Sequence, residues 1–243
     1  MEAIKALSLG KLTLGGKSVA LVAPNGSGKT SNCIAPAILY FLTCFPRGQV
    51  PVTSSSWMQV EKQLFPALRR YMDNPFFAGW TFNKTEIRTP EGGFAVGFST
   101  DNAGRAEGWH PKISPDVDPV FYVLDEAKTI PDSIFTAVSR CTLFHAFITS
   151  SPGADSGTFY DCFHKNSSLY YKIRVKYEDC PHIEINDPGK AERLKKEYGE
   201  QSSFYRSAIL GEFTDLDGQS VISRRSLMEL VNNPPPFLDT GET

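Results

Sequence analysis

Long apolar runs are missing from this 243-residue sequence. The longest one, residues 34–45, is interrupted by Pro36 and is shorter than the ~18 residues that suggest a membrane span. At the N-terminus, Glu2 and Lys5 are not followed by the apolar stretch of a secretory signal peptide. We therefore expect neither a membrane span nor a membrane partner.

The sequence also lacks an excess of charge of one sign. Its 25 Lys and Arg oppose 27 Asp and Glu, which gives a net charge of −2 and excludes a histone-like polycation. A local basic patch stays possible, because net charge does not report how charges are distributed. Zinc-ligand spacing is missing too: the five cysteines form no CxxC pair, which is typical of reduced thiols in a cytosol-like compartment.

Segments of strand length alternate with segments of helix length. The apolar patterns predict strands at residues 18–22, 49–53, 120–124, 146–149 and 170–175. They predict helices at residues 31–45, 58–72, 131–138, 191–198 and 202–210, and a β-hairpin within residues 80–98. Pro36 should kink or interrupt the first of these helices. This alternation predicts an α/β fold with a mostly parallel central sheet flanked by helices.

A Gly-rich segment between the first strand and the first helix has the phosphate-loop (Walker A) pattern. It reads Ala23, Pro24, Asn25, Gly26, Ser27, Gly28, Lys29, Thr30, with alanine where the pattern begins with glycine. The glycines let backbone amides turn toward phosphate oxygens, and the helix N-terminus adds partial positive charge. We expect Lys29 to reach the β- and γ-phosphates and Thr30 to ligate Mg²⁺. A Gly-rich turn that merely contains Lys-Thr is the alternative, and the flanking strand and helix argue against it.

Two carboxylates, Asp125 and Glu126, directly follow the most apolar predicted strand. Adjacent side chains at an extended strand end point to different sides, so the two groups can take different roles. We expect Asp125 to hold the Mg²⁺ shell and Glu126 to polarise the attacking water, which favours hydrolysis over transfer to a hydroxyl. An acidic pair that only begins a loop or caps the next helix is the alternative, and the phosphate loop argues against it.

Hydroxyl side chains end a further predicted strand, where residues 147–153 read FITSSPG. Beside the acidic strand, Ser150 and Ser151 would place a hydroxyl near the γ-phosphate and could pass its presence on to a moving element. A strand followed by an ordinary Ser-Pro-Gly turn explains these residues equally well.

The order of further motifs is more particular than the phosphate loop. The chain continues with WMQV at 57–60, GRAEGWH at 104–110, VLDEAKTIPD at 123–132, TSSPG at 149–153, GTFY at 157–160, YGEQS at 198–202 and LGEF at 210–213. This series, over about residues 18–230, resembles the ATPase domain of the large subunit of tailed-bacteriophage DNA-packaging terminases.

The resemblance implies a P-loop NTPase fold of the RecA-like, ASCE type over residues 1–213. It also implies a small C-terminal linker subdomain, residues 214–243, that leads toward a nuclease domain. The implied activity is Mg²⁺-dependent ATP hydrolysis that drives double-stranded viral DNA into a procapsid. The implied partners are DNA, the portal protein, the small terminase subunit and further copies of the chain in a ring, in the host cell cytoplasm. Because the sequence stops where the family's nuclease domain begins, we expect no nuclease activity from it.

Applied residue by residue, the resemblance implies the same roles for the phosphate loop and the acidic pair as those given above: phosphate and Mg²⁺ binding, and activation of water. Ser150 and Ser151 fall in the family's coupling motif. Arg105 is the best match for the arginine that family members place near the γ-phosphate, in cis or from a neighbouring subunit. A surface-loop arginine is its other interpretation. One departure concerns base recognition, because residues 1–17 contain no Gln and no aromatic residue where the family has an adenine-contacting segment.

The sequence leaves the DNA-contacting residues open. Its basic residues form two groups, Lys62, Arg69, Arg70, Lys84 and Arg88, and Lys190, Arg193, Lys195 and Lys196. Either group could be a solvated helix face. A helicase-like remodelling ATPase and a nucleotide-gated assembly module with little turnover remain alternative functions, although 243 residues leave no room for a second motor domain.

Overall fold

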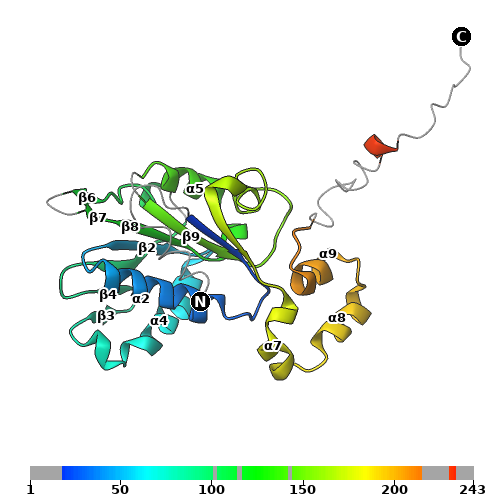
Figure 1. Cartoon of the computed structure of the whole chain (residues 1–243), viewed down its shortest axis with the longest axis horizontal. Coiled ribbons are helices and arrows are strands. Elements are labelled where there is room, and N and C mark those ends of the chain that lie inside the picture. The colour runs from blue at the N-terminus through cyan, green and yellow to red at the C-terminus, as the bar shows by residue number, and fades with distance from the viewer. Residues whose placement is uncertain (1–17, 101–102, 114–116, 142–143, 215–229, 234–243) are drawn as a thin grey trace, which may run out of the picture.

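The computed structural model describes residues 18–100, 103–113, 117–141, 144–214 and 230–233. Residues 1–17, which lack the Gln and aromatic residues of the family's adenine-contacting segment, lie outside this part, as does most of the predicted linker at 214–243. The boundary between the ATPase domain and its linker therefore stays a prediction. In the described part, helices cover both faces of one central sheet (Figure 1).

The sheet has eight strands in the order β10-β1-β9-β8-β2-β5-β4-β3. Its strands are β1 Ser18–Val22, β2 Gln49–Thr53, β3 Thr81–Asn83, β4 Glu86–Arg88, β5 Phe94–Gly97, β8 Val120–Leu124, β9 Phe144–Ser150 and β10 Tyr170–Arg174. Neighbours from β10 to β5 are parallel, while β5, β4 and β3 pair antiparallel. A separate ribbon pairs β6 Lys112–Ile113 with β7 Val117–Asp118. The predicted mostly parallel α/β sheet is confirmed, and the predicted hairpin is a three-stranded meander.

The helices of the described part are mostly short. They are α2 Ala35–Cys44, α3 Trp57–Gln59, α4 Phe65–Met72, α5 Asp132–Ser139, α6 Thr158–Asp161, α7 Pro181–Asn186, α8 Lys190–Tyr198 and α9 Ser203–Tyr205. Wider π turns span Lys29–Ile34, Val60–Leu64 and Arg206–Leu210, and single 3₁₀ turns span Pro75–Phe77, Ala103–Arg105, Ala127–Thr129, Ser167–Leu169 and Tyr177–Asp179. The predicted interruption at Pro36 is the point where the π turn passes into α2. Proline is tolerated there because its missing N–H falls in the first turn of α2.

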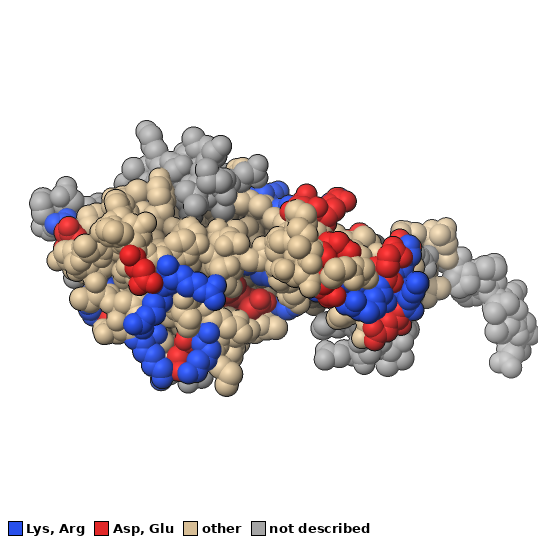
Figure 2. All heavy atoms as spheres, turned by 90° about the horizontal axis from the view of Figure 1, so that it is seen from below, with Lys and Arg blue, Asp and Glu red and all other residues tan. Residues whose placement is uncertain are grey.

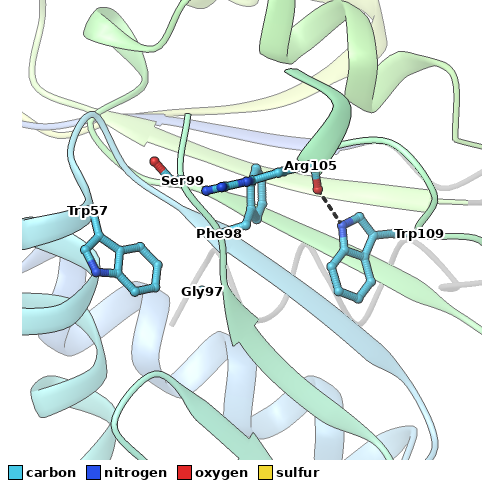
Figure 3. Close-up of a pocket in the computed structure, with 6 residues that line it drawn as sticks. All are labelled: Trp57, Gly97, Phe98, Ser99, Arg105 and Trp109. Atoms are coloured by element: carbon cyan, nitrogen blue, oxygen red, sulfur yellow. Dashed lines mark hydrogen bonds between the residues drawn. The ribbon is translucent and has the colours of Figure 1, made fainter. Parts of the chain in front are cut away.

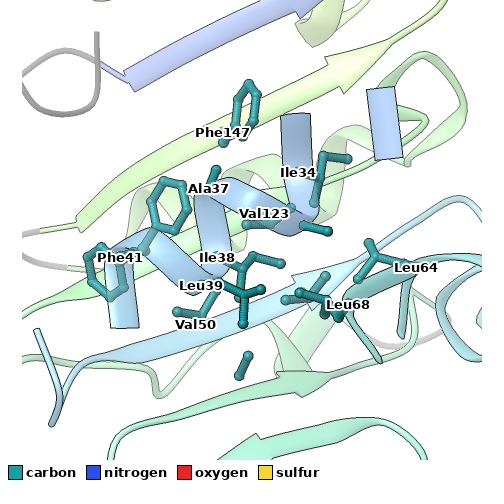
Figure 4. Packing of buried hydrophobic residues seen from close by; sticks show 14 of the residues in the cluster. Ile34, Ala37, Ile38, Leu39, Phe41, Val50, Leu64, Leu68, Val123 and Phe147 are labelled. Atoms are coloured by element: carbon teal, nitrogen blue, oxygen red, sulfur yellow. The ribbon is translucent and has the colours of Figure 1, made fainter. Parts of the chain in front are cut away.

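Two apolar cores lie on opposite faces of the sheet. On one face, α2 and α4 pack on alternate strand residues such as Leu21 and Val123 (Figure 4). On the other face, α5 and α6 pack on residues such as Val22 and Leu124. Strand β8 is buried on both faces, which explains its unbroken apolar sequence. Among the described residues, no helix is both long and apolar enough to cross a bilayer.

The parallel register brings three strand ends to one edge. Val22 pairs with Ser150, and Leu124 pairs with Ile148. Strand β9 lies between β1 and β8. The hydroxyl-rich end of β9 therefore lies between the phosphate loop and the acidic pair, at the carboxyl edge where open α/β sheets bind ligands.

Helices α7, α8 and α9 form a small helical segment beside the β10 end of the sheet (Figure 1). The predicted helices at 191–198 and 202–210 are confirmed in it. The short helices α6 and α7 were not predicted from the sequence, because one or two helical turns show too little periodicity of apolar residues. The Ser207 hydroxyl donates to the Pro152 carbonyl oxygen at 3.0 Å, which ties this segment to the loop after β9.

Candidate nucleotide site

The phosphate loop adopts the conformation that its glycines allow. Gly26 and Gly28 have φ values of 82° and 81°, in the left-handed region that favours glycine. A Cβ at Gly28 would lie 2.5 Å from Nδ2 of the Asn32 side chain. A residue with a side chain would therefore be both strained in its backbone and crowded at this position. The turn places the first helical residues of Lys29–Ile34 directly after it.

Lys29 is buried beneath this loop. Its Nζ donates to the carbonyl oxygens of Ala23 at 3.3 Å and Pro24 at 3.2 Å. Burial lowers the pKa of Lys29, and the carboxylates of Glu126 and Asp125 oppose that shift. The ammonium group is thus held at the end of β1, between the loop backbone and the acidic pair.

Asp125 is the polar centre of the site and is only 5% exposed. Its Oδ2 accepts a hydrogen bond from Thr30 Oγ1 at 3.0 Å, and its Oδ1 accepts from Thr149 Oγ1 at 2.8 Å and from the Glu126 amide at 3.0 Å. Burial raises the pKa of this carboxyl, although the hydroxyl donors act in the opposite direction. The structure thus brings Thr30 and Asp125 together, as their predicted metal role requires.

The oxygen donors of this site suit a hard cation. Mg²⁺ is commonly held by one or two protein oxygens together with substrate phosphates. Thr30 and Asp125 supply such a pair, and no group of three or more His, Cys, Asp or Glu elsewhere in the described ranges could hold a metal. The Ser27 hydroxyl is buried without a hydrogen-bond partner in the described part, which suits a loop that receives phosphate oxygens.

Glu126 leaves the strand in a strained conformation. With φ 51° and ψ 43°, it is the one non-glycine residue of positive φ in the described ranges. The expectation that both carboxylates lie at an extended strand end is therefore wrong, because the backbone at Glu126 is left-handed. Such strain clusters at functional positions and costs ~1–3 kcal/mol. The Ser150 hydroxyl donates to Glu126 Oε2 at 3.4 Å.

The hydroxyls at the end of β9 hold the turn after Glu126. Ser150 Oγ accepts from the Lys128 amide at 3.3 Å, and Lys128 Nζ donates to Ser151 Oγ at 2.7 Å. Both serines are buried. The structure thus connects the predicted coupling residues with the acidic pair. No sequence pattern predicted the contacts of Lys128 and Thr149, although the parallel order of β8 and β9 places Thr149 beside Asp125.

Arg105 lies on a different part of the same edge. It closes the turn Ala103–Arg105, which follows β5 in the chain. With its neighbours it lines a cavity of about 570 Å³ (Figure 3), whose other lining residues are Trp57, Gly97, Phe98, Ser99 and Trp109.

Two hydrogen bonds fix the turn that carries Arg105. Trp109 Nε1 donates to the Arg105 carbonyl oxygen at 3.0 Å, and the buried Tyr122 hydroxyl donates to the Ala106 carbonyl oxygen at 2.8 Å. Because Tyr122 belongs to β8, the strand that ends at Asp125 also anchors the arginine turn.

Helix α7 covers the phosphate loop from the other side. The His182 ring nitrogen lies 3.0 Å from the Gly26 carbonyl oxygen, and a Cβ at Gly26 would lie 4.0 Å from the Ile183 side chain. No sequence pattern predicted this contact. A segment more than 150 residues beyond the loop therefore borders its open side.

Comparison with solved structures defines the fold. The large terminase of a thermophilic bacteriophage, solved in complex with ADP, superposes with a TM-score of 0.62 at 12% identity, covering 87% of this chain and 52% of that one. The ATPase domain of the Thermus phage P74-26 large terminase superposes with a TM-score of 0.61 at 16% identity, covering 88% and 96%. The chain has the fold of a large-terminase ATPase domain.

This terminase ATPase fold accounts for nearly all of the described chain. The chain spans about half the length of the first of these large terminases, which has also been solved in complex with ATP-γ-S and then superposes with a TM-score of 0.58. The expected mostly parallel α/β architecture agrees with these structures, whose fold the chain shares. No protein-family model matches the sequence, and no curated protein does.

Proposed function

We propose that this chain hydrolyses ATP, with Mg²⁺, as the motor domain of a DNA-packaging terminase. The observation that carries the proposal is the contact between Thr30 and Asp125, 3.0 Å from hydroxyl to carboxylate. It joins the predicted phosphate loop to the predicted acidic strand end, on the terminase ATPase fold.

Each group at the carboxyl edge has a role in this proposal. Lys29 binds the β- and γ-phosphates, and Thr30 and Asp125 hold Mg²⁺, which neutralises phosphate charge when bound. Glu126 orients the attacking water and accepts its proton. Ser150 and Ser151 link the position of Glu126 to the loop after β9 through Lys128.

Arg105 serves the site of a neighbouring copy. Its turn lies beyond β5, and Trp109 and Tyr122 hold that turn in place. An arginine presented in this way suits a ring in which each copy completes the next site and stabilises charge in the transition state. Hydrolysis is then expected to depend on assembly.

The work done by hydrolysis is translocation of double-stranded viral DNA into a procapsid in the host cytoplasm. The portal protein, the small terminase subunit and other copies of the chain are the proposed partners. The similarity of fold to phage large terminases supports this assignment, as does the order of motifs in the sequence.

Steady-state phosphate release by wild type, Lys29→Ala and Glu126→Gln tests the hydrolytic part. We expect Lys29→Ala to lose ATP binding, and Glu126→Gln to bind ATP while its turnover falls by at least ~100-fold, the scale of a lost general base. Turnover by Glu126→Gln at the wild-type rate would contradict the site. Tight ATP binding without hydrolysis by the assembled wild type would favour an assembly module, and separation of short duplexes would favour a helicase-like enzyme.

A further inference from the structure

Exposed cations follow one side of α4 and the adjoining hairpin. They are Lys62 in the turn Val60–Leu64, Arg69 and Arg70 in the last turn of α4, and Lys84 between β3 and β4. We call these four residues the α4 basic strip. Figure 2, which shows the molecule from below, has a cluster of blue side chains on the part of the molecule opposite the helical segment, with few red side chains among them.

Contacts with the sheet edge hold the strip in position. The Arg69 guanidinium lies 5.1 Å from the ring centroid of Phe82, which belongs to the edge strand β3. Lys84 and Lys62 both reach Glu61 Oε1, at 3.0 Å and 3.1 Å. These contacts join the helix to the hairpin, so the cations form one preorganised surface.

The charges of the strip are only partly balanced. Glu61 is the partner of both lysines, and its side chain is 16% exposed, whereas those of Lys62 and Lys84 are 67% and 72% exposed. Within the described ranges neither Arg69 nor Arg70 forms an ion pair, and Asp73 is the other carboxylate on this helix end. Four cations therefore face two carboxylates.

The second basic group has a different charge pattern. On the helical segment, Arg193 pairs with Asp187 at 2.8 Å and Lys195 pairs with Glu200 at 2.9 Å. Figure 2 shows red and blue side chains interleaved over this segment. Two of its four cations are paired, and Glu192 and Glu197 lie on the same helix as the others, so the segment presents little net charge to a polyanion.

Arg88 does not belong to the strip either. It alternates along β4 with Ile87, which is buried in the α4-side core, so Arg88 faces the other side of the sheet. There its guanidinium contacts the Phe94 ring at 5.4 Å. The structure thus reduces the nine basic positions of the sequence to four.

We propose that the α4 basic strip binds the phosphate backbone of double-stranded DNA. The eight-residue rise from Lys62 to Arg70 covers ~12 Å of helix, a length over which one DNA strand carries three or four phosphates at ~3.4 Å of helix axis each. Contacts to phosphates carry no sequence information, which suits a substrate that must move past the protein. This inference rests on the proposed function, because it names where the motor holds its substrate.

The strip also reaches the edge of the sheet that carries the nucleotide site. Strands β3 and β5 run in the same direction, since both are antiparallel to β4, and the Gly97 amide donates to the Thr85 carbonyl oxygen at 3.0 Å. Lys84 therefore lies at the carboxyl edge, the same edge as Asp125. Bound DNA would contact the edge at which hydrolysis takes place.

Fluorescence anisotropy with a labelled 30-base-pair duplex, without nucleotide, tests the proposal over a series of salt concentrations. The triple variant Arg69→Gln/Arg70→Gln/Lys84→Gln should bind at least 10-fold more weakly at low salt, with the slope of log K against log salt reduced by about 2 to 3. The matched control Lys190→Gln/Arg193→Gln/Lys195→Gln removes the same charge and should stay within twofold of wild type.

Equal losses in the two triple variants would reduce the effect to net charge and overturn the proposal, as would unchanged binding by the strip variant. If the strip variant melts early by circular dichroism, Arg70→Gln alone replaces it and should lower the slope by about one. Hydrolysis by the wild type is measured separately. A wild type that binds DNA through the strip without hydrolysing ATP would refute the proposed function and leave this inference standing.

Discussion

The Thr149 hydroxyl donates to Asp125 Oδ1 at 2.8 Å, across the boundary between β9 and β8. Both residues are almost fully buried. The contact connects the carboxylate that we propose to hold Mg²⁺ with the strand whose next residue, Ser150, contacts Glu126. One short run of hydroxyls thus holds both carboxylates.

Thr149→Val should weaken the apparent affinity for Mg²⁺ more than the affinity for nucleotide. Valine keeps the volume of threonine but leaves Asp125 Oδ1 with the Glu126 amide alone, at a cost of ~1–3 kcal/mol. We expect the Mg²⁺ concentration at half-maximal ATPase activity to rise several-fold. Thr136→Val is the control, because the Thr136 hydroxyl donates only to the exposed helix carbonyl of Asp132. A normal Mg²⁺ requirement in Thr149→Val would show that Asp125 does not need this donor.

Glu126→Gly should be more stable than Glu126→Ala, although both variants should lose turnover. Glycine adopts φ near 51° without the penalty that a side chain incurs there, whereas Glu126→Ala keeps that penalty. We expect urea unfolding to give a higher free energy of unfolding for the Gly variant than for the Ala variant, by ~1 kcal/mol. Both variants lose the carboxylate, so their hydrolysis rates should be equally low. Equal stabilities would mean that the turn after β8 relaxes without strain.

If Arg105 acts on the site of a neighbouring subunit, two variants that are each inactive should restore hydrolysis when they are mixed. Arg105→Ala has an intact Glu126, and Glu126→Gln has an intact Arg105. In a ring that contains both, each Gln variant can supply the missing arginine to its neighbour, so the mixture should hydrolyse ATP faster than either variant alone.

The measurement is phosphate release at a fixed total concentration while the ratio of the two variants changes. Wild-type turnover per subunit should also rise with protein concentration. A mixture that never exceeds the sum of its parts, together with a flat concentration dependence, would place the function of Arg105 within its own subunit.

Much of this architecture could be predicted from local sequence. Strand β8 is apolar at every position because both its faces are buried, and the phosphate loop carries its own glycines. The parallel sheet followed from the alternation of strands and helices. Contacts that depend on strand order could not be predicted in this way, and the Thr149–Asp125 hydrogen bond is one of them.

Other features had no local signal at all. Helix α7 has six residues, too few for a clear period, and only the fold brings His182 to Gly26. The left-handed turn at Glu126 breaks the usual preference of residues with side chains, so no local pattern signals it. The unequal charge balance of the two basic groups likewise depends on which carboxylates the fold places beside them.

Tyr122→Phe should disconnect the arginine turn from β8. The Tyr122 hydroxyl is buried and donates to the Ala106 carbonyl oxygen, and it also contacts the Cys141 sulfur at 2.9 Å. Removing the hydroxyl leaves a buried carbonyl without this donor, so we expect a loss of ~1–3 kcal/mol in the free energy of unfolding. The ring itself stays, so the apolar contacts of β8 should be kept.

Turnover and ATP affinity of Tyr122→Phe show whether Tyr122 positions Arg105 or only stabilises the fold. If Tyr122 positions Arg105, Tyr122→Phe should lower the turnover of assembled protein several-fold while ATP affinity stays within twofold of wild type, because the phosphate loop is unaffected. Ser139→Ala, which removes an exposed hydroxyl on α5, serves as a control that should change neither quantity. Because Tyr122 and Arg105 act through one turn, Arg105→Ala should already carry the full loss of turnover, and adding Tyr122→Phe to it should lower only stability. A further fall in turnover in the double variant would show that Tyr122 acts on the site by another route.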